Sequence, residues 1–133
     1  MMRRALLFTS MLIAFGTQAQ AANQVECGNS QSQTAMNECV GRNMKAADEK
    51  LNQTYRALMA KVSKDGAEQL RKSQRAWVAW RDAQCEFDTM SSRTGSIHSA
   101  MQGMCIEQLT REQTKHLDSQ LHCEEGDMSC GGQ

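Results

Sequence analysis

The stretch QRAWVAWRDAQC, residues 74–85, is where side chains of this sequence come closest to forming a chemical site. It holds two tryptophans, two arginines, an aspartate and a cysteine, namely Arg75, Trp77, Trp80, Arg81, Asp82 and Cys85. A carboxylate and a guanidinium beside an indole ring are typical of a small-molecule or sugar pocket. Acid-base catalysis needs a second carboxylate at a defined separation, and nucleophilic catalysis needs a Ser or Cys beside a His. The sequence shows neither pattern and no glycine-rich phosphate loop, so we expect no enzymatic activity.

Potential soft-metal ligands form a second group of chemically capable side chains. His98, Met101, Met104 and Cys105 fall on neighbouring turns of a predicted helix, and thioether and thiol ligands favour Cu(I). Methionines at helical spacing more often fill gaps in a core, and the cysteines lack the CxxC spacing of structural zinc sites. We therefore expect no metal and no cofactor, with Cu(I) binding as an alternative.

The first 21 residues have the pattern of a secretory signal peptide. Arg3 and Arg4 precede a mostly apolar run over 5–15, and Ala19-Gln20-Ala21 is a small-x-small cleavage pattern. The run is shorter than the ~20 residues that a membrane helix needs, and no lipoprotein cysteine follows it. We expect cleavage after Ala21 and export to the periplasm or medium without a membrane anchor. Residues 22–123 would then form one helical domain, and 124–133 a flexible tail.

Charge and cysteine content limit the partners and the compartment. Cleavage would leave 112 residues with 13 basic and 15 acidic side chains, a balance that argues against nucleic acid as a partner. All six cysteines would remain, and an even number in a small exported domain predicts a disulfide framework. The loop geometry favours three pairs, Cys27 with Cys39, Cys85 with Cys105, and Cys123 with Cys130. An exchange of partners among the first four is the main rival.

The spacing of apolar residues predicts three helices and no strand. From Met36 to Val62 such residues recur every three or four positions, close to the helical period of ~3.6, which predicts a helix over 34–64. Ser30, Ser32 or Thr34 can cap it. A second helix is expected over 67–87, with the stripe Leu70, Trp77, Trp80 and Phe87. A third is expected over 96–121, with the inward residues Ile97, Met101, Met104, Leu109, Leu117 and Leu121.

Short loops between these helices favour antiparallel neighbours, so we predict an all-α, three-helix antiparallel bundle with a long helical hairpin, stapled by disulfides. A hairpin turning at Lys64-Asp65 brings three pairs of residues level: Asp48 with Arg81, Asn52 with Trp77, and Tyr55 with Gln74. A buried guanidinium is tolerated only when it is paired, which gives Arg81 a reason to lie beside Asp48. We expect these six residues to form a structural seam that fixes the register, with a ligand pocket as the alternative. Asp82, Arg75 and Trp80 are then left for the outer surface.

Several motifs carry a resemblance to a known family. They are Cys27 and Cys39, AADEKLNQTYRAL (46–58), LRKSQRAWVAWRDAQC (70–85) and CIEQLTREQTKHL (105–117). Together they resemble the lysozyme inhibitor LprI-like N-terminal domain family over nearly all of 22–133. The resemblance implies a small, all-helical, exported bacterial domain with a lysozyme as its candidate partner. Gln113 stands where similar sequences often have an arginine, and Cys123 and Cys130 are additions to the four-cysteine pattern.

An exported binding or inhibitor protein of this family is therefore the first functional expectation, with another protein as its partner. Vertebrate-type lysozyme is strongly cationic, so an inhibitor should present acidic groups. The best acidic candidates are Glu86, Asp88, Glu124, Glu125 and Asp127. The alternatives are a Cu(I)-binding protein and an envelope stress helper that binds other proteins. Basic residues cluster near the tip of the predicted hairpin. We expect them to be solvent-exposed, with a contact to anionic lipid or polymer as the alternative; they are Lys61, Lys64, Arg71, Lys72 and Arg75.

Overall fold

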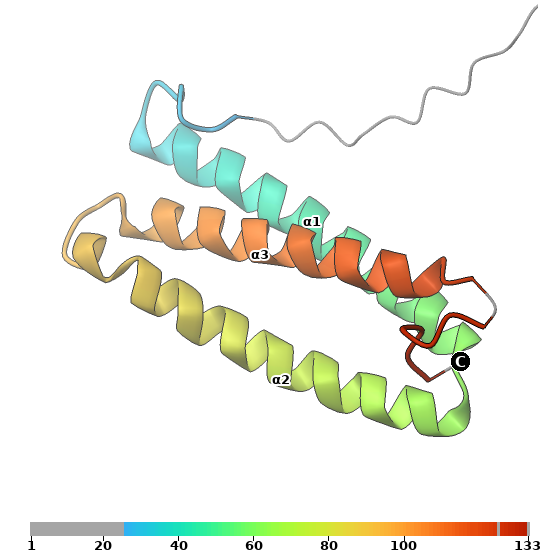
Figure 1. The fold of residues 1–133 in the computed structure, drawn as a ribbon. Helices are drawn as coiled ribbons and strands as arrows, with labels where there is room; N and C mark the ends of the chain where they lie inside the picture. Colours follow the sequence, from blue (N-terminus) through green and yellow to red (C-terminus); the bar gives the residue numbers. More distant parts are fainter. Residues whose placement is uncertain (1–25, 125, 133) are drawn as a thin grey trace, which may run out of the picture.

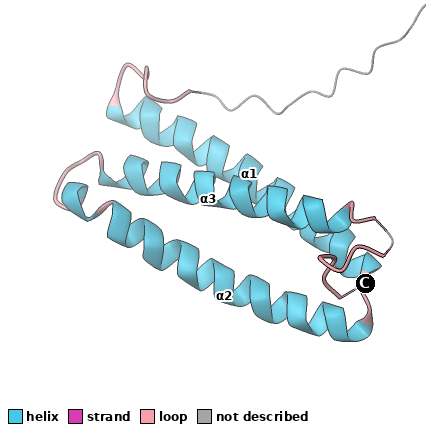
Figure 2. Cartoon of the chain, viewed as in Figure 1, coloured by secondary structure: helices cyan, strands magenta, loops and turns pink. Residues whose placement is uncertain are grey.

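The computed structural model describes residues 26–124 and 126–132, and the predicted signal peptide lies outside these ranges. Three long helices run through them: α1 (Gln33–Lys61), α2 (Lys64–Asp88) and α3 (His98–Leu121). A short 3-10 helix, η1 (Met90–Ser92), lies in the connection between α2 and α3. The described residues contain no strand (Figure 2). The all-α prediction and the three-helix arrangement are confirmed.

Serine hydroxyls determine where the first two helices begin. Ser32 Oγ accepts a hydrogen bond from Ala35 N at 3.1 Å, so Ser32 is the cap among the three candidates. Ser63 Oγ accepts from Gly66 N at 3.1 Å and caps α2. This cap places Asp65 and Gly66 inside the first turn, which is why α2 begins three residues earlier than the sequence predicts.

Helices α1 and α3 form the close pair of the bundle, and most contacts between helices join these two (Figure 1). Small residues on both helices allow this approach, among them the buried Ala47, Ala100 and Gly103. A Cβ atom at Gly103 would lie only 2.9 Å from Met44 Sδ and would also meet Val40 Cγ1. The side chains of α1 therefore occupy the space in front of this glycine.

The buried face of α3 differs from the predicted one. Its buried residues are Ala100, Gly103, Glu107, Thr110, Thr114 and Leu117. Thr110 and Thr114 satisfy their hydroxyls within the helix, by donating to the carbonyl oxygens of Ile106 and Thr110 at 2.7 and 2.8 Å. Two of the predicted inward residues, Ile97 and Met101, are each 41% exposed, so their assignment to the core is wrong. The physical reason is that α3 packs on α1 through small residues rather than through its largest apolar ones.

Two apolar clusters make up the core. One surrounds the first disulfide and contains Cys27, Cys39, Val40 and Ala100, with Met36, Met44 and Met104 packed against it. The other contains Leu51, Leu58 and Leu117, with Tyr55, Val62, Leu70, Trp77 and Leu121 packed against it. The second cluster is the one to which α2 contributes, through Leu70 and Trp77. No helix in the described residues has the length and apolar character to cross a membrane.

Three disulfides tie the chain together. They join Cys27 to Cys39, Cys85 to Cys105, and Cys123 to Cys130, with Cα–Cα distances of 5.7, 5.6 and 5.7 Å. This is the connectivity that the loop geometry favoured over its rival. The second bridge holds the end of α2 against α3, while α2 makes few contacts with α1.

Candidate functional site

A polar cleft opens where the sequence predicts a closed seam between α1 and α2. The α1/α2 cleft has a volume of about 360 Å³ and is lined by Asp48, Leu51, Asn52, Tyr55, Arg71, Gln74, Arg75, Val78 and Arg81. A second hollow continues from it toward α3 and shares Asp48 and Arg81 with it. The small residues between α1 and α3 bring those helices together, while the bulky Tyr55, Leu70 and Trp77 occupy the space beside α2. The cleft follows from this difference in side-chain size.

Arg81 is fixed at one end of the cleft, but not by the predicted partner. Its Nε and Nη2 atoms lie 2.9 and 2.7 Å from Asp82 Oδ1, and Nη1 donates to Thr110 Oγ1 at 3.2 Å. The guanidinium also lies over the ring of Trp77, 5.2 Å from its centroid. Asp48 instead accepts from Asn52 Nδ2 at 3.0 Å. The predicted pair of Asp48 with Arg81 is therefore corrected, because α2 packs toward α3 and a neighbouring aspartate neutralises the arginine.

The other seam residues are divided between the cleft and α3. Gln74 accepts a hydrogen bond from Gln113 Nε2 at 3.2 Å, so the glutamine at this position of α3 does make a polar contact with α2. Tyr55 and Trp77 are half-buried against the second apolar cluster. Arg71 and Arg75, which the sequence analysis places at a solvated end, line the cleft. Arg71 and Arg75 are four residues apart and Gln74 directly precedes Arg75, and this spacing is the sequence feature that could have placed both arginines on the cleft side of α2.

An exposed aromatic stripe follows another face of α2. Trp80 and Phe87 are 50% and 69% exposed and lie two helical turns apart, with Ala83 between them and Ala76 one turn before Trp80 on the same face. Trp77 turns inward and Trp80 outward, which agrees with the outward position expected for Trp80. Phe87 was expected in the inward stripe and is the most exposed aromatic residue among those described. Its spacing of seven from Trp80 was the signal that could have identified it.

The acidic residues predicted to attract a cationic partner lie at opposite ends of the molecule. Glu86 and Asp88 are in the last turn of α2, beside η1. The described tail residues lie beside the α1–α2 turn, where Ser63 N and Oγ donate to Gly132 O at 2.7 and 2.9 Å (Figure 1). The 25 residues of α2 separate the two groups by roughly 37 Å along the helix axis. They cannot form one acidic surface.

The tail is anchored and closes one side of a second pocket. Gly131 N donates to Gln120 Oε1 at 2.8 Å, and Gln120 Nε2 donates to Ser129 O at 3.2 Å. The backbones of Gly132 and Gly66 touch, so neither position has room for a side chain. These glycines border a pocket of about 450 Å³ between the ends of α1, α2 and α3. The tail that the sequence predicts to be flexible is thus held at several points.

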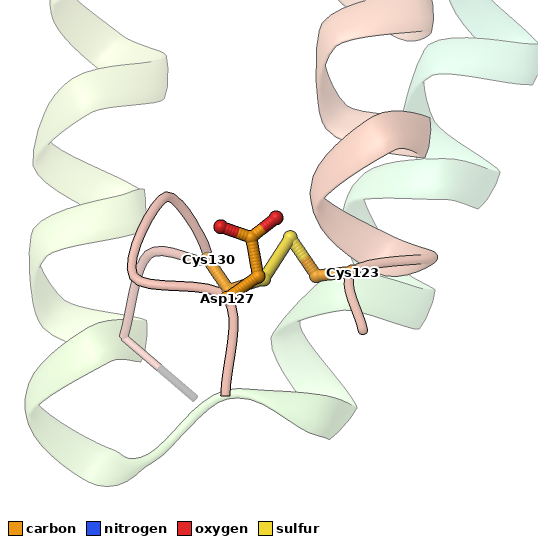
Figure 3. Close-up of side chains that lie close together, drawn as sticks. All are labelled: Cys123, Asp127 and Cys130. Atoms are coloured by element: carbon orange, nitrogen blue, oxygen red, sulfur yellow. A yellow bond between two sulfur atoms is a disulfide. The ribbon is translucent and has the colours of Figure 1, made fainter. Parts of the chain in front are cut away.

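Figure 3 shows Cys123, Asp127 and Cys130, whose potential ligand atoms lie within 4.8 Å of one another. Both sulfurs belong to one disulfide, so they offer no thiolate to a metal. Asp127 Oδ1 accepts from Ser129 N at 2.9 Å and from Ser129 Oγ at 2.8 Å. These two hydrogen bonds lower the pKa of Asp127 below its usual value. The carboxylate serves to shape the tail turn.

The methionine and histidine group on α3 has no free thiol beside it in this structure. Cys105 is bound to Cys85 as a disulfide, and His98 Nδ1 lies 3.1 Å from Ser92 Oγ. Met104 packs against the first apolar cluster. The thiol on which the Cu(I) alternative depends is therefore oxidised.

Comparison with known proteins identifies the family. The family model described as "Lysozyme inhibitor LprI" matches residues 26–117. The chain belongs to the lysozyme inhibitor LprI family. The LprI match begins beside the first disulfide and ends in α3, so it includes the α1/α2 cleft and the aromatic stripe. The tail and its disulfide lie outside the LprI match.

A relative supports the same assignment. The chain is 34% identical over 130 residues to "Uncharacterized protein R02472" from Rhizobium meliloti (strain 1021). The aligned region covers 87% of this chain and 94% of the relative. No solved structure matches the chain. The LprI family name is thus the finding that points to a protein partner.

Proposed function

We propose that this protein is an exported inhibitor-type binding protein, without enzymatic activity, whose partner is a lysozyme-type hydrolase. The observation that carries the proposal is the match to the lysozyme inhibitor family over residues 26–117. Three disulfides are consistent with an oxidising compartment such as the periplasm, which the leader over 1–21 would reach.

The aromatic stripe is the surface that suits a protein partner best. Trp80 and Phe87 project from α2 without being needed in either apolar cluster. Large exposed apolar side chains that share one face often mark an interaction site, and tryptophan is among the residues that contribute most to binding energy. An inhibitor can use such an edge to cover a groove on the hydrolase.

Charge beside the stripe fits a cationic partner. The last turn of α2 holds Glu86 and Asp88 and no basic residue. Carboxylates at a helix C-terminus interact unfavourably with the helix dipole, each by about 0.3 to 1 kcal/mol when they are exposed. Both carboxylates nevertheless remain exposed, Asp88 with a hydrogen bond from Gln84 Nε2 at 2.8 Å, and they are available to attract a positively charged protein. Arg93 neutralises Glu86 in part, at 2.8 Å, and leaves Asp88 without an ion pair among the described residues.

A lysis assay tests this proposal. Vertebrate-type lysozyme is added to a cell-wall suspension with increasing amounts of the purified, oxidised protein from residue 22 onward, and the decrease in turbidity is followed. We expect the rate of lysis to fall as the protein is added, and to recover with added salt when compared with lysozyme alone at the same salt. Undiminished lysis at a large molar excess would rule the proposal out.

A further inference from the structure

The α1/α2 cleft carries two arginines whose charges are not neutralised. Arg71 and Arg75 lie one helical turn apart on α2, line the cleft, and have no ion pair or hydrogen bond within the described ranges. Arg81, the third arginine of the cleft, already donates to Asp82 and Thr110. The free hydrogen-bond donors are therefore concentrated at the end of the cleft nearer the α1–α2 turn.

The α1 wall of the cleft offers acceptors. Asp48 and Asn52 lie one turn apart on α1, and among the described residues the aspartate carboxylate accepts a single hydrogen bond, from Asn52 Nδ2. Tyr55 is the next cleft residue along α1, and Leu51 forms an apolar floor at 3% exposure. A ligand in the cleft thus meets guanidinium groups from α2, and an aromatic ring, a carboxylate and an amide from α1.

We propose that the α1/α2 cleft binds a small saccharide that carries one carboxylate. Guanidinium groups bind carboxylates with paired, charge-assisted hydrogen bonds, which assigns the acidic group to Arg71 and Arg75. Asp48 repels a second anionic group but accepts hydrogen bonds from hydroxyls, so the remainder of the ligand is neutral and rich in hydroxyl groups. The volume of about 360 Å³ is at the lower end of the range of ~300 to 1,000 Å³ for ligand pockets, which suits one or two sugar rings.

This site is separate from the surface proposed for the hydrolase. The lining residues of the cleft do not include Trp80, Phe87, Glu86 or Asp88. Saccharide binding and lysozyme inhibition can therefore be lost independently of each other.

The test uses two sugars that differ only at one carbon. Glucuronic acid carries a carboxylate where glucose carries a hydroxymethyl group, and acetate supplies the anion without the ring. Each is titrated into the oxidised protein, and binding is followed by NMR chemical shifts of the cleft residues. We expect glucuronic acid to bind at least tenfold more tightly than glucose or acetate. Equal affinity for glucose, equal affinity for acetate, or no shift with any of the three overturns the proposal.

Matched variants locate the binding. The double variant R71Q/R75Q should weaken glucuronic acid binding about tenfold or more, while K72Q, an exposed cation of the same helix outside the cleft, should leave it unchanged. D48N should weaken binding less than R71Q/R75Q, because its amide still accepts from a hydroxyl. An equal loss in K72Q and R71Q/R75Q shows a general charge effect and contradicts the assignment. All three variants replace exposed side chains, and helical circular dichroism verifies their folding.

Discussion

Gly103 sets how closely α1 and α3 approach. The variant G103A should lower the free energy of unfolding by about 1 to 3 kcal/mol, because the added methyl meets Val40 and Met44. Gly41 is the matched control, since it lies inside α1 with nothing within 4 Å of the added atom. G41A should stabilise the protein by about 0.5 to 1 kcal/mol. Chemical denaturation measures both, and a destabilisation of equal size in the two variants contradicts the close packing at Gly103.

Glu107 is the charged residue of the core, and its side chain is 2% exposed. Arg111 Nε donates to its Oε1 at 2.8 Å from one turn away. The variant R111A leaves this carboxylate unpaired and should lower the free energy of unfolding by about 2 to 3 kcal/mol. This loss is somewhat smaller than for a fully buried ion pair, because Arg111 is partly exposed. K115A, an exposed cation one turn further along α3, should change it by less than about 0.5 kcal/mol. Equal effects of the two substitutions would argue against the pair.

Neither Gly103 nor Glu107 could be assigned to the core from the sequence. Apolar periodicity places large hydrophobic residues inward, whereas α3 buries a glycine, threonines and a glutamate against α1. A carboxylate becomes acceptable there only because Arg111 follows one turn later, and many exposed i, i+4 pairs show the same spacing. The pairing of the six cysteines, by contrast, could be predicted from the sequence, because the lengths of the loops between them restrict which cysteines can come within bonding distance.

At the scale of whole elements, the sequence predicts the bounds of the helices well, but it does not predict which two helices pack most closely. The observed bounds lie within about three residues of the predicted ones, because apolar spacing and serine caps are local properties. The prediction of a seam between α1 and α2 rests on the assumption that helices consecutive in sequence pack most closely. The choice of α3 as the partner of α1 depends on small residues in both helices, which carry no periodic signal. The α1/α2 cleft is the consequence.

The tail disulfide should control a local element rather than the bundle. In C123S/C130S we expect faster hydrogen exchange at Ser63 and Gly131, whose amides are bonded to Gly132 and Gln120. The unfolding of the helices should change little, because the tail can detach without opening the core. C85S/C105S should instead cost about 3 kcal/mol, because it removes a bridge between two helices. Similar losses of global stability in the two double variants contradict this division.

Asp127 makes the order of the tail depend on pH. Its pKa is lowered in the folded protein by hydrogen bonds from Ser129, so the folded tail favours the charged carboxylate. The resulting stabilisation is present above the usual carboxyl pKa and is lost as the pH falls through the lower, folded value. Ser129 donates to Asp127 through its backbone N and its hydroxyl, and the S129A variant removes only the hydroxyl bond. An NMR titration should therefore give Asp127 a lower midpoint in the unsubstituted protein than in S129A. Identical midpoints would exclude a contribution from the hydroxyl.

At the scale of the whole molecule, three surfaces are distributed over different parts of one bundle. The α1/α2 cleft carries unpaired arginines, the end of α2 carries carboxylates beside the aromatic stripe, and the anchored tail covers the α1–α2 turn. Composition alone indicates a nearly neutral protein and argues against nucleic acid as a partner. Charge separates along α2, with Arg71 and Arg75 toward its start and Glu86 and Asp88 at its end, and this acidic, aromatic end is the one that suits a cationic protein.

The inhibition constant of the double variant W80A/F87A against vertebrate-type lysozyme shows whether the aromatic stripe is the inhibitory surface. V78A is the matched control, since Val78 is an exposed apolar residue on the cleft side of the same helix. We predict that W80A/F87A raises the inhibition constant about tenfold or more, because exposed aromatic residues at a binding surface contribute a large share of its energy. V78A should leave it within about twofold, which is within the ~0.5 kcal/mol expected of a neutral surface change. Unchanged inhibition by a folded W80A/F87A protein, or a loss confined to V78A, would contradict the assignment of the aromatic stripe as the inhibitory surface.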